Sequence, residues 1–346
     1  KCPVWIKENC IQCNQCSFVC PHAVIRPYLL NEEEYNNAPD IIKNDVLNAV
    51  GSEYKFKIGV STMDCTGCSL CANVCPGKNG QKALVMKPFE DVEHDNGIEY
   101  LSKVKEKKEQ VKNTVKASQF KKPLFEFNGA CAGCGETPYL KLLTQLYGEN
   151  MIVANATGCS SIYGGSLPSI PYKLPWSNSL FEDNAEYGYG MLVASNTIRF
   201  RIKHLMEKNI NNVDDTTKEL FNKWLNNYDD VVITKEVYES LDYQKVPYLE
   251  ELKQYIISRS IWIFGGDGWA YDIGFGGLDH VLSSNENINV LVLDTEVYSN
   301  TGGQTAKSSN TGTIEKFASI GKKTQEKDLA RIALTYPDTY VAQVSM

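Results

Sequence analysis

CIQCNQCSFVCP at residues 10–21 returns in altered form as CTGCSLCANVCP at residues 65–76, so one pattern of four cysteines and a proline occurs twice. Three cysteines at intervals of two residues let a short loop wrap three irons of one cubane, and the fourth, followed by proline, ligates the other cluster. The first predicted set of 4Fe–4S ligands is therefore Cys10, Cys13, Cys16 and Cys75. The second predicted set is Cys20, Cys65, Cys68 and Cys71.

Structural zinc is the alternative use of such cysteines. Zinc takes four ligands, as two pairs, and has no use for a third cysteine at the next interval. A disulfide framework is typical of small secreted domains with little core, whereas this chain has 346 residues, 42% of them hydrophobic, for its 12 cysteines. The pattern favours iron–sulfur chemistry in a reducing compartment or an anaerobic organism, because exposed clusters and thiolates oxidise readily.

The overall charge and hydropathy exclude two classes of partner. The net charge is −7 and no basic block is dense enough to follow a phosphate backbone, so we expect no nucleic-acid partner. No apolar run reaches the roughly 18 residues that cross a bilayer, so we expect no membrane span. Lys1 stands where an initiator methionine would be, and YVAQVSM at residues 340–346 breaks off within a predicted strand. We therefore expect both ends to be cut.

Composition divides the chain into three predicted regions. Residues 1–95 contain both motifs and are expected to form an α+β ferredoxin-like domain with two 4Fe–4S clusters. The polar spacer between the motifs is expected to fold as a short helix and a strand edge. Residues 96–122 are charged and rich in lysine, which predicts an exposed helical linker. Residues 123–346 form the third region, a larger domain that we expect to be truncated at its C-terminus.

Residues 123–346 alternate apolar runs with amphipathic stretches. The predicted strands are 151–156, 260–266, 288–294 and 339–344. The predicted helices are 137–147, 185–208, 216–227, 248–258, 269–284 and 327–335. Buried strands that alternate with helices indicate a parallel α/β sheet, and ligands of such sheets bind at the carboxyl ends of the strands.

A glycine-rich segment, GGDGWAYDIG at residues 265–274, follows one of these strands. Gly266 and Gly268 let the backbone approach a bound group, and the start of the following helix favours an anion. Asp267 would repel that anion unless a divalent cation lay between them, so a metal-bridged diphosphate resolves the conflict. Taken alone, the segment could equally be a β-turn.

A second polar segment, DTEVYSNTGGQT at residues 294–305, follows the next predicted strand and supports the cofactor interpretation. It offers the Thr295 hydroxyl, the Val297 carbonyl and the Asn300 amide. With Asp267, these are hard oxygen ligands that suit Mg²⁺ when it also binds two phosphate oxygens and water. The two segments together predict a magnesium-bridged diphosphate site.

This pair of segments resembles the diphosphate-binding domain of thiamine diphosphate enzymes. Longer strings closely resemble the family of pyruvate:ferredoxin oxidoreductases, or pyruvate synthases: FNGACAGCGETPY (127–139), ATGCSSIYGG (156–165), WSNSLFEDNAEYG (176–188), GDGWAYDIGFGGLDHVL (266–282) and DTEVYSNTGGQ (294–304). The resemblance covers essentially the whole chain. It implies the C-terminal part of such an enzyme, with the ferredoxin-like domain followed by most of an α/β thiamine diphosphate-binding domain.

The resemblance also gives a role to three cysteines outside the two motifs. Cys131, Cys134 and Cys159 are implied to bind a third 4Fe–4S cluster beside the thiamine, with a fourth cysteine beyond residue 346. Without the resemblance, Cys131 and Cys134 could form half a zinc site or a redox pair. Asn300 is implied to reach toward the reacting end of the cofactor. Glu136 is either a contact of the thiamine or its cluster, or an ordinary carboxylate at a helix start.

The reaction implied by the resemblance is the oxidative decarboxylation of pyruvate with coenzyme A to acetyl-CoA and CO2, with electrons passing through three clusters to ferredoxin or flavodoxin. Three alternatives stay open: another 2-oxoacid:ferredoxin oxidoreductase, a pyruvate:NADP oxidoreductase with a fused reductase domain, and a non-catalytic electron-transfer module. The residues that grip pyruvate and activate the aminopyrimidine are expected in missing N-terminal domains or another chain. We expect a homodimer, in the cytoplasm or in the hydrogenosome of an anaerobic eukaryote.

Overall fold

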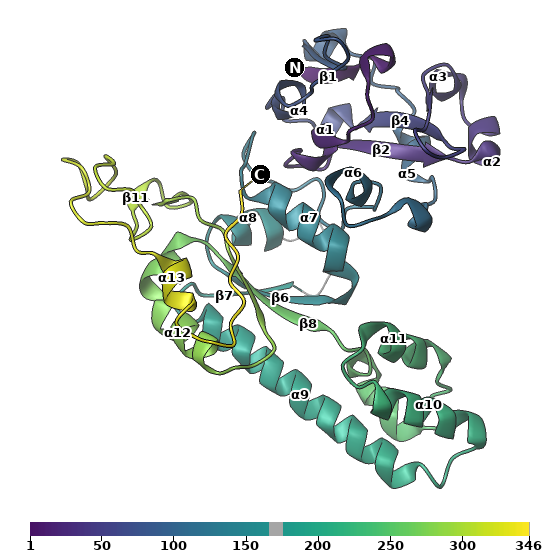
Figure 1. The fold of residues 1–346 in the computed structure, drawn as a ribbon, viewed down its shortest axis with the longest axis vertical. Coiled ribbons are helices and arrows are strands. Elements are labelled where there is room, and N and C mark those ends of the chain that lie inside the picture. The colour runs from purple at the N-terminus through teal and green to yellow at the C-terminus, as the bar shows by residue number, and fades with distance from the viewer. Residues whose placement is uncertain (166–175, 346) are drawn as a thin grey trace. The chain divides into compact units, whose positions relative to one another are not determined.

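The computed structural model describes residues 1–165 and 176–345, and they form two compact units (Figure 1). The first unit contains Lys1–Gly148, residues 162–165 and residue 345. The second unit contains Glu149–Ser161 and residues 176–344. Residues 96–148 thus belong to the same compact unit as the two cysteine motifs.

The first unit is built on two small antiparallel sheets. One has the strand order β2–β4–β3, with β2 at Ile25–Leu30, β4 at Lys55–Val60 and β3 at Leu47–Asn48. The other pairs β1 (Cys2–Trp5) with β5 (Leu84–Lys87). Phe56 and Ile58 of β4 are buried in a core that also contains cysteines of both motifs. This core positions the two ligand-loop helices, α1 (Gln15–Phe18) and α4 (Leu70–Asn73).

The polar spacer between the motifs contains two short helices rather than the single one predicted, and it also supplies β3 and β4. The helices are α2 (Glu32–Asn36) and α3 (Asp40–Lys43). A capping box starts α2, in which Asn31 accepts a hydrogen bond from the Glu34 backbone and the Glu34 side chain accepts one from the Asn31 backbone. This reciprocal pair satisfies two backbone donors that would otherwise be unpaired at the helix start.

Residues 96–122 do not form the predicted exposed helix. They contain α5 (Ile98–Ser102), the 3₁₀ turn η4 (Lys108–Gln110) and α6 (Val115–Ser118). Leu101 is fully buried in a small apolar cluster with Leu30, Ala38 and Ile42. The few apolar residues of this segment therefore find a core within the first unit, although the surrounding lysines mask them in the sequence pattern.

The second unit contains a parallel sheet in the order β7–β6–β8–β9 (Figure 1). Its strands are β6 (Met151–Ala156), β7 (Trp176–Ser179), β8 (Ser260–Gly265) and β9 (Asn289–Val292). The helices α9 (Asn184–Asn209) and α12 (Phe275–Ser283) accompany the sheet. A Cβ on Gly188 of α9 would lie 2.5 Å from the Ile263 side chain of β8, so the close helix–sheet approach requires glycine there. The predicted parallel α/β architecture is confirmed.

One predicted strand is wrong and one strand was not predicted. Residues 339–344 form no strand, and Tyr340 and Val344 are 92% and 72% exposed. An apolar, β-branched run becomes a strand only where a neighbouring strand pairs with it, and none of the described strands does so here. The edge strand β7 was missed because its sequence, WSNS, lacks an apolar run.

The long helix α9 leads into a helical region with its own core. Its elements are α10 (Asp215–Asn226), α11 (Val231–Ser240) and the 3₁₀ helix η6 (Pro247–Tyr255). Trp224 is fully buried, and its Nε1 donates to the Ile256 carbonyl at 2.8 Å. Asp214 and Asp230 accept backbone N–H groups at the starts of α10 and α11, which stabilises both helix ends.

The remaining elements are short. They are η1 (Lys7–Asn9), η2 (Thr62–Asp64), η3 (Phe89–Asp91), α7 (Thr137–Tyr147), η5 (Gly148–Asn150), α8 (Cys159–Gly165), the π-helical turn η7 (Gly268–Ile273), β10 (Val297–Tyr298), β11 (Gln304–Thr305) and α13 (Leu329–Ala333). The predicted helix at 269–284 is thus divided into η7 and α12. Within residues 1–165 and 176–345, no helix combines the length and apolar character that spanning a bilayer would take.

Candidate cluster sites and diphosphate site

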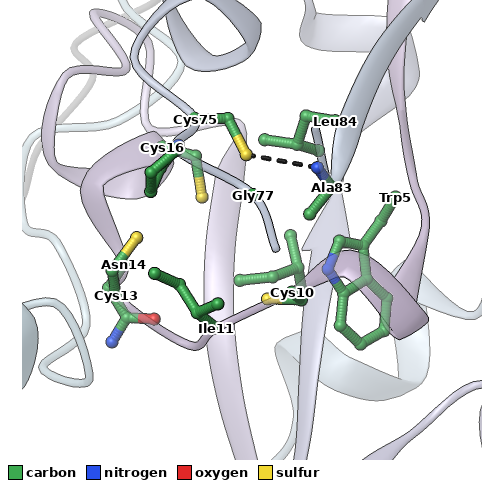
Figure 2. Close-up of a pocket in the computed structure, with 12 residues that line it drawn as sticks. Trp5, Cys10, Ile11, Cys13, Asn14, Cys16, Cys75, Gly77, Ala83 and Leu84 are labelled. Carbon is green, nitrogen blue, oxygen red and sulfur yellow. Dashed lines mark hydrogen bonds between the residues drawn. The ribbon is translucent and has the colours of Figure 1, made fainter. Parts of the chain in front are cut away.

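Four cysteines drawn from both motifs line one cavity in the first unit (Figure 2). They are Cys10, Cys13, Cys16 and Cys75. The cavity contains about 340 Å³ of space outside the protein atoms, part of it open to solvent. The Ala83 backbone N–H donates to Cys75 Sγ at 3.3 Å, which fixes this sulfur at the cavity wall (Figure 2). The structure therefore brings the last cysteine of the second motif to the first three cysteines of the first motif.

Both ligand loops turn through left-handed backbone at corresponding positions. The residues and their φ angles are Gln12 (57°) and Asn14 (61°) in the first motif, and Gly67 (72°) and Ser69 (68°) in the second. In the first loop this turn lets the Gln12 backbone N–H donate to Cys10 Sγ at 3.4 Å. Hydrogen bonds from backbone N–H groups favour the thiolate form of a cysteine, which is the form that binds iron.

The second group of cysteines gathers in the same way. It contains Cys20, Cys65, Cys68 and Cys71, whose sulfurs are close enough to influence one another electrostatically. Burial, together with the neighbouring sulfurs, Cys20 first, raises the pKa of Cys71 to about 12. Burial likewise raises the pKa of Cys16 in the first group. Thiols held in this way need the positive charge of bound metal to become thiolates, so both groups fit a metal cluster.

The arrangement of the cysteines bears on the choice between a cluster and a single zinc ion. With Zn–S bonds of about 2.3 Å, tetrahedral zinc requires sulfurs about 3.8 Å apart. Among the residues that the structure describes, no three His, Cys, Asp or Glu side chains converge closely enough to hold one metal ion. The first cysteine group instead surrounds an open volume. An open volume between four cysteines has the room that a multi-iron cubane needs.

The loop that contains Cys131 and Cys134 is anchored beside the end of the first motif. Asn128 Nδ2 donates to the Pro21 carbonyl at 2.8 Å, the Phe127 N–H donates to the His22 carbonyl at 2.9 Å, and His22 Nε2 lies 2.9 Å from the Ala130 carbonyl. A Cβ on Gly133 would lie 3.7 Å from Cys68 Cβ. The loop therefore lies next to the second cysteine group. Cys159 belongs to the second unit, so a shared third cluster stays a prediction.

Glu136, at the start of α7, is buried and hydrogen-bonded to a tyrosine. The Tyr163 hydroxyl donates to Glu136 Oε2 at 2.6 Å, and burial raises the pKa of the carboxyl group. The side chain makes no capping hydrogen bond to the backbone of α7. Tyr163 thus orients the side chain, while Glu136 itself lies at the N-cap of α7, so a contact with the thiamine or its cluster stays a prediction.

Asp267 is the buried centre of the candidate diphosphate site in the second unit. It follows β8, immediately before η7, and only 3% of its surface is exposed. Its Oδ2 accepts from the Thr295 backbone at 3.1 Å and from Thr295 Oγ1 at 2.8 Å. Its Oδ1 accepts from Ser308 Oγ at 2.5 Å and from the Glu296 backbone at 3.1 Å. Burial, aided by Asp294, raises the pKa of Asp267 to about 7, so a nearby cation would favour its ionised form.

The Thr295 hydroxyl lies at hydrogen-bonding distance from the other two predicted magnesium ligands. Thr295 Oγ1 lies 2.8 Å from Asp267 Oδ2 and 3.0 Å from the Val297 carbonyl oxygen. Neighbouring ligands around Mg²⁺, at bond lengths of 2.0–2.1 Å, are about 3.0 Å apart. The structure thus places the Thr295 hydroxyl between the other two predicted ligands, and their binding of Mg²⁺ stays a prediction.

The two flanking glycines and Asn300 differ in how the structure constrains them. A Cβ on Gly268 would lie 3.2 Å from the Tyr298 ring, so the tight approach of this ring favours glycine. A Cβ on Gly266 would meet only the Leu293 carbonyl, at 3.7 Å, which leaves room above the backbone. Asn300 lies exposed in the turn between β10 and β11, outside the hydrogen bonds of Asp267.

The sequence interpretation missed Ser308, Asp294 and Tyr271. Ser308 is fully buried and donates to Asp267, but it lies 41 residues away in a polar segment without a spacing signal. Tyr271 donates its hydroxyl to Asp294 Oδ2 at 2.5 Å. The position of Asp294, two residues after β9, could have indicated it, because polar residues at strand ends gather at the ligand-binding edge.

Two family models match the chain in these regions. The model described as "4Fe-4S dicluster domain" matches residues 9–79, and "Thiamine pyrophosphate enzyme, C-terminal TPP binding domain" matches residues 252–345. The first range contains both cysteine groups, and the second contains Asp267, Thr295 and Val297. The chain thus combines an α+β ferredoxin-like region that binds iron–sulfur clusters with an α/β region of the thiamine diphosphate-binding fold.

The alignments with similar proteins cover nearly the whole chain. It is 48% identical, over 99% of its length, to "Pyruvate-flavodoxin oxidoreductase" of Klebsiella pneumoniae and "Pyruvate:ferredoxin oxidoreductase" of Moorella thermoacetica. It is 42% identical over 99% of its length to an NADP(+) pyruvate dehydrogenase of Cryptosporidium parvum, of which it covers 20%. A solved 2-oxoglutarate:ferredoxin oxidoreductase of Magnetococcus marinus matches with 14% identity and a TM-score of 0.30, over 54% of this chain and 42% of that chain.

The chain covers 31% of each of the first two relatives, so it spans about a third of their length. Within that span it contains both four-cysteine groups and the oxygen cluster around Asp267. These features accompany 48% identity over 99% of the chain, so the chain corresponds to a part of the pyruvate:ferredoxin and pyruvate-flavodoxin oxidoreductases.

Proposed function

We propose that the protein to which this chain belongs oxidises pyruvate with coenzyme A to acetyl-CoA and CO2, and passes the electrons through three 4Fe–4S clusters to ferredoxin or flavodoxin. The proposal rests on the observation that one chain contains both cysteine groups and the set of oxygen atoms around Asp267. Cubanes transfer single electrons, whereas the cofactor of the oxygen site performs carbon chemistry. The names of the relatives support pyruvate as the substrate.

The oxygen cluster holds the cofactor in this proposal. Asp267, Thr295 and the Val297 carbonyl bind Mg²⁺, which in turn binds the diphosphate, while Gly266 and Gly268 let the backbone approach the phosphates. When bound there, thiamine diphosphate would supply the carbanion chemistry that the decarboxylation of a 2-oxoacid needs.

Two side chains are the catalytic candidates of this chain. Asn300 is assigned to the reacting end of the cofactor, because the exposed turn after β10 leaves its amide free to face a bound molecule. Glu136 is assigned as the second, because burial and the Tyr163 hydroxyl fix the orientation of its carboxyl group. Their roles are separable by experiment, since substitution of Asn300 in an exposed turn leaves the core unchanged.

The order of electron transfer follows from the anchoring of the Cys131–Cys134 loop. This loop contacts Pro21 and His22, beside the cysteine group of Cys20. We therefore assign the route from a third cluster, bound by Cys131, Cys134, Cys159 and a fourth cysteine beyond residue 346, to the Cys20 group and then to the Cys10 group. The Cys10 cavity is open to solvent, which suits the last cluster before an external acceptor.

The remaining parts of the enzyme are proposed from its relatives. The residues that bind the pyruvate carboxylate and activate the aminopyrimidine are assigned to N-terminal domains outside residues 1–346, so we expect no turnover by residues 1–346 alone. The sequence-based modules 1–95, 96–122 and 123–346 stay a proposal, although residues 96–148 share a compact unit with the cysteine motifs. A homodimer, in the cytoplasm or hydrogenosome, completes the proposal.

The test is an assay of the complete protein for CoA-dependent release of CO2 from a panel of 2-oxoacids, with a viologen dye as electron acceptor. We expect activity with pyruvate. Activity with oxoglutarate or an aryl pyruvate alone would show that this acid, and not pyruvate, is the substrate. No activity with any acid despite bound thiamine would indicate a non-catalytic electron-transfer module.

A pyruvate:NADP oxidoreductase is the second candidate function, because the Cryptosporidium and Euglena relatives carry NADP(+) in their names. Supplying NADP⁺ in place of the dye distinguishes the two functions. Reduction of NADP⁺ without added ferredoxin would favour this second candidate.

A further inference from the structure

Lys141 is a buried lysine whose ammonium group faces the end of a cluster-ligand helix. It lies within α7 and is 1% exposed. Its Nζ donates to the backbone carbonyl of Ser17, to that of Phe18 at 2.9 Å and to that of Cys20 at 3.3 Å. These carbonyls lie at the C-terminal end of α1 and just beyond it, where helix carbonyls lack partners within the helix.

This position places Lys141 beside ligands of both cysteine groups. Cys16 lies within α1 and belongs to the Cys10 group, whereas Cys20 follows α1 and belongs to the second group. Lys141 Nζ donates to the carbonyl of Cys20 itself and to that of Ser17, the residue that follows Cys16. One cation therefore acts on two proposed clusters.

Burial lowers the pKa of Lys141 from 10.5 to about 8, whereas the contacts of its Nζ favour the charged form. An ammonium has three N–H donors, and three carbonyl oxygens face it. A neutral amine would have only two donors and would turn its lone pair toward a carbonyl oxygen. All of its acceptors in the described part of the chain are neutral carbonyls, so no carboxylate cancels the charge.

A second lysine provides an internal comparison. Lys82 Nζ donates to the carbonyls of Ala72 at 2.5 Å and Asn73 at 3.1 Å, at the end of α4 in the second motif. Lys82 thus caps α4 as Lys141 caps α1. The two differ in burial, because Lys82 is exposed whereas Lys141 is excluded from water.

We propose that Lys141 is a positioning residue that raises the reduction potentials of the two ferredoxin-type clusters by holding an uncompensated cation beside both. Reduction adds one negative charge to a cluster, and a buried cation stabilises that charge far more than an exposed, water-screened one. Hydrogen bonds, net charge and solvent exposure are the means by which proteins set cluster potentials. The inference rests on the proposed function only in treating the two cysteine groups as redox-active clusters.

The experiment compares four variants of the complete, cluster-loaded protein in an EPR-monitored redox titration with dithionite, without pyruvate or coenzyme A. Lys141→Gln and encoded Nε-acetyl-lysine at position 141 remove the charge but keep an N–H donor. Lys141→Arg keeps the charge, and Lys82→Gln removes the matching exposed cap. Iron content and thermal unfolding are measured for each variant.

We expect both neutral variants at position 141 to shift the reduced-to-oxidised ratio of the ferredoxin-type clusters about tenfold toward the oxidised form. This corresponds to about 59 mV for a one-electron couple. The arginine variant should stay close to the parent protein, and Lys82→Gln should shift the ratio much less than Lys141→Gln.

Potentials unchanged in both neutral variants with full iron content would overturn the proposal and leave Lys141 a structural cap. An equal shift in Lys82→Gln would overturn the role of burial. Loss of iron from both neutral variants would also overturn it, because Lys141 would then be required for assembly. Since pyruvate is absent, these outcomes are independent of whether the proposed reaction is correct.

Discussion

Thr295 Oγ1 lies 2.8 Å from Asp267 Oδ2, although 28 residues separate the two in the chain. The register of the parallel sheet produces this contact, because Gly265 at the end of β8 pairs with Val292 at the end of β9. The segments that follow both strands therefore leave the sheet at the same edge, where parallel α/β folds bind ligands.

Replacing Thr295 by valine should weaken Mg²⁺ binding by at least about tenfold, because valine keeps the shape of threonine but lacks the oxygen that contacts Asp267 and the Val297 carbonyl. The measurement is a calorimetric titration of Mg²⁺ into the complete protein with thiamine diphosphate present. The control is Thr301→Val, whose hydroxyl donates only to Gln304 in the neighbouring hairpin. Equal affinities in the two variants would contradict the magnesium assignment.

Cys75→Ser and Cys10→Ser should remove the same cluster, although the two residues belong to different motifs. Both line the cavity of the first group, so either substitution should lower the iron content by roughly four atoms. Cys71→Ser should instead remove the cluster of the second group. Iron analysis and EPR spectra of the three variants check the assignment. If Cys75→Ser gave the spectrum of Cys71→Ser, the exchange of fourth ligands between the motifs would be wrong.

Trp224→Ala should destabilise the helical region by roughly 3–5 kcal/mol, because it removes a fully buried indole from the core between α9, α10 and α11. Trp224→Phe should cost less, since it keeps an aromatic ring and loses the hydrogen bond to the Ile256 carbonyl. Urea unfolding followed by circular dichroism gives both values. EPR signals of the ferredoxin-type clusters should not change, because this core contains none of their ligands.

Lys327 should make folding stability depend on pH in the alkaline range. Burial, with a smaller effect of Lys307, lowers the pKa of Lys327 from 10.5 to about 8, and its Nζ donates to the Tyr271 carbonyl. Because the folded-state pKa is the lower one, the ammonium opposes folding below pH 8, and this cost disappears as the pH rises from 8 to 10.5.

The parent protein should therefore gain stability over this range relative to Lys327→Met, which cannot titrate. Urea unfolding midpoints at several pH values between 8 and 10.5 measure the difference. Parallel pH profiles for the two proteins would show that Lys327 does not titrate in the folded state as expected.

Sequence patterns located the elements whose periodicity is strong. The helix predicted at 137–147 and the strand predicted at 151–156 have the observed bounds of α7 and β6. Both are bounded by polar or glycine residues that interrupt the apolar pattern, so local sequence defines their ends. The spacing of the cysteines was similarly informative about the cluster ligands, because cysteine intervals reflect the local geometry of a loop around a cubane.

The elements and contacts that the sequence did not predict have a common physical cause, which is packing between residues far apart in the chain. Residues 339–344 have the composition of a strand but lack a pairing partner, whereas β7 has a poor composition but pairs with β6. Leu101 finds its apolar partners about 60 to 70 residues earlier in the chain, in β2 and the spacer helices. Ser308 and Lys141 likewise act on residues far away in sequence, and no local pattern identifies such contacts.

The exchange of fourth cysteines between the motifs has a consequence for damage and repair. Each cysteine group takes three residues from one loop and one from the other, and the two short helices α1 and α4 lie between these ligands. If oxygen destroys one cubane, the surviving one loses the neighbour that immobilises its borrowed sulfur. We therefore expect the surviving cubane to be more sensitive to oxygen than the same cubane in the intact pair.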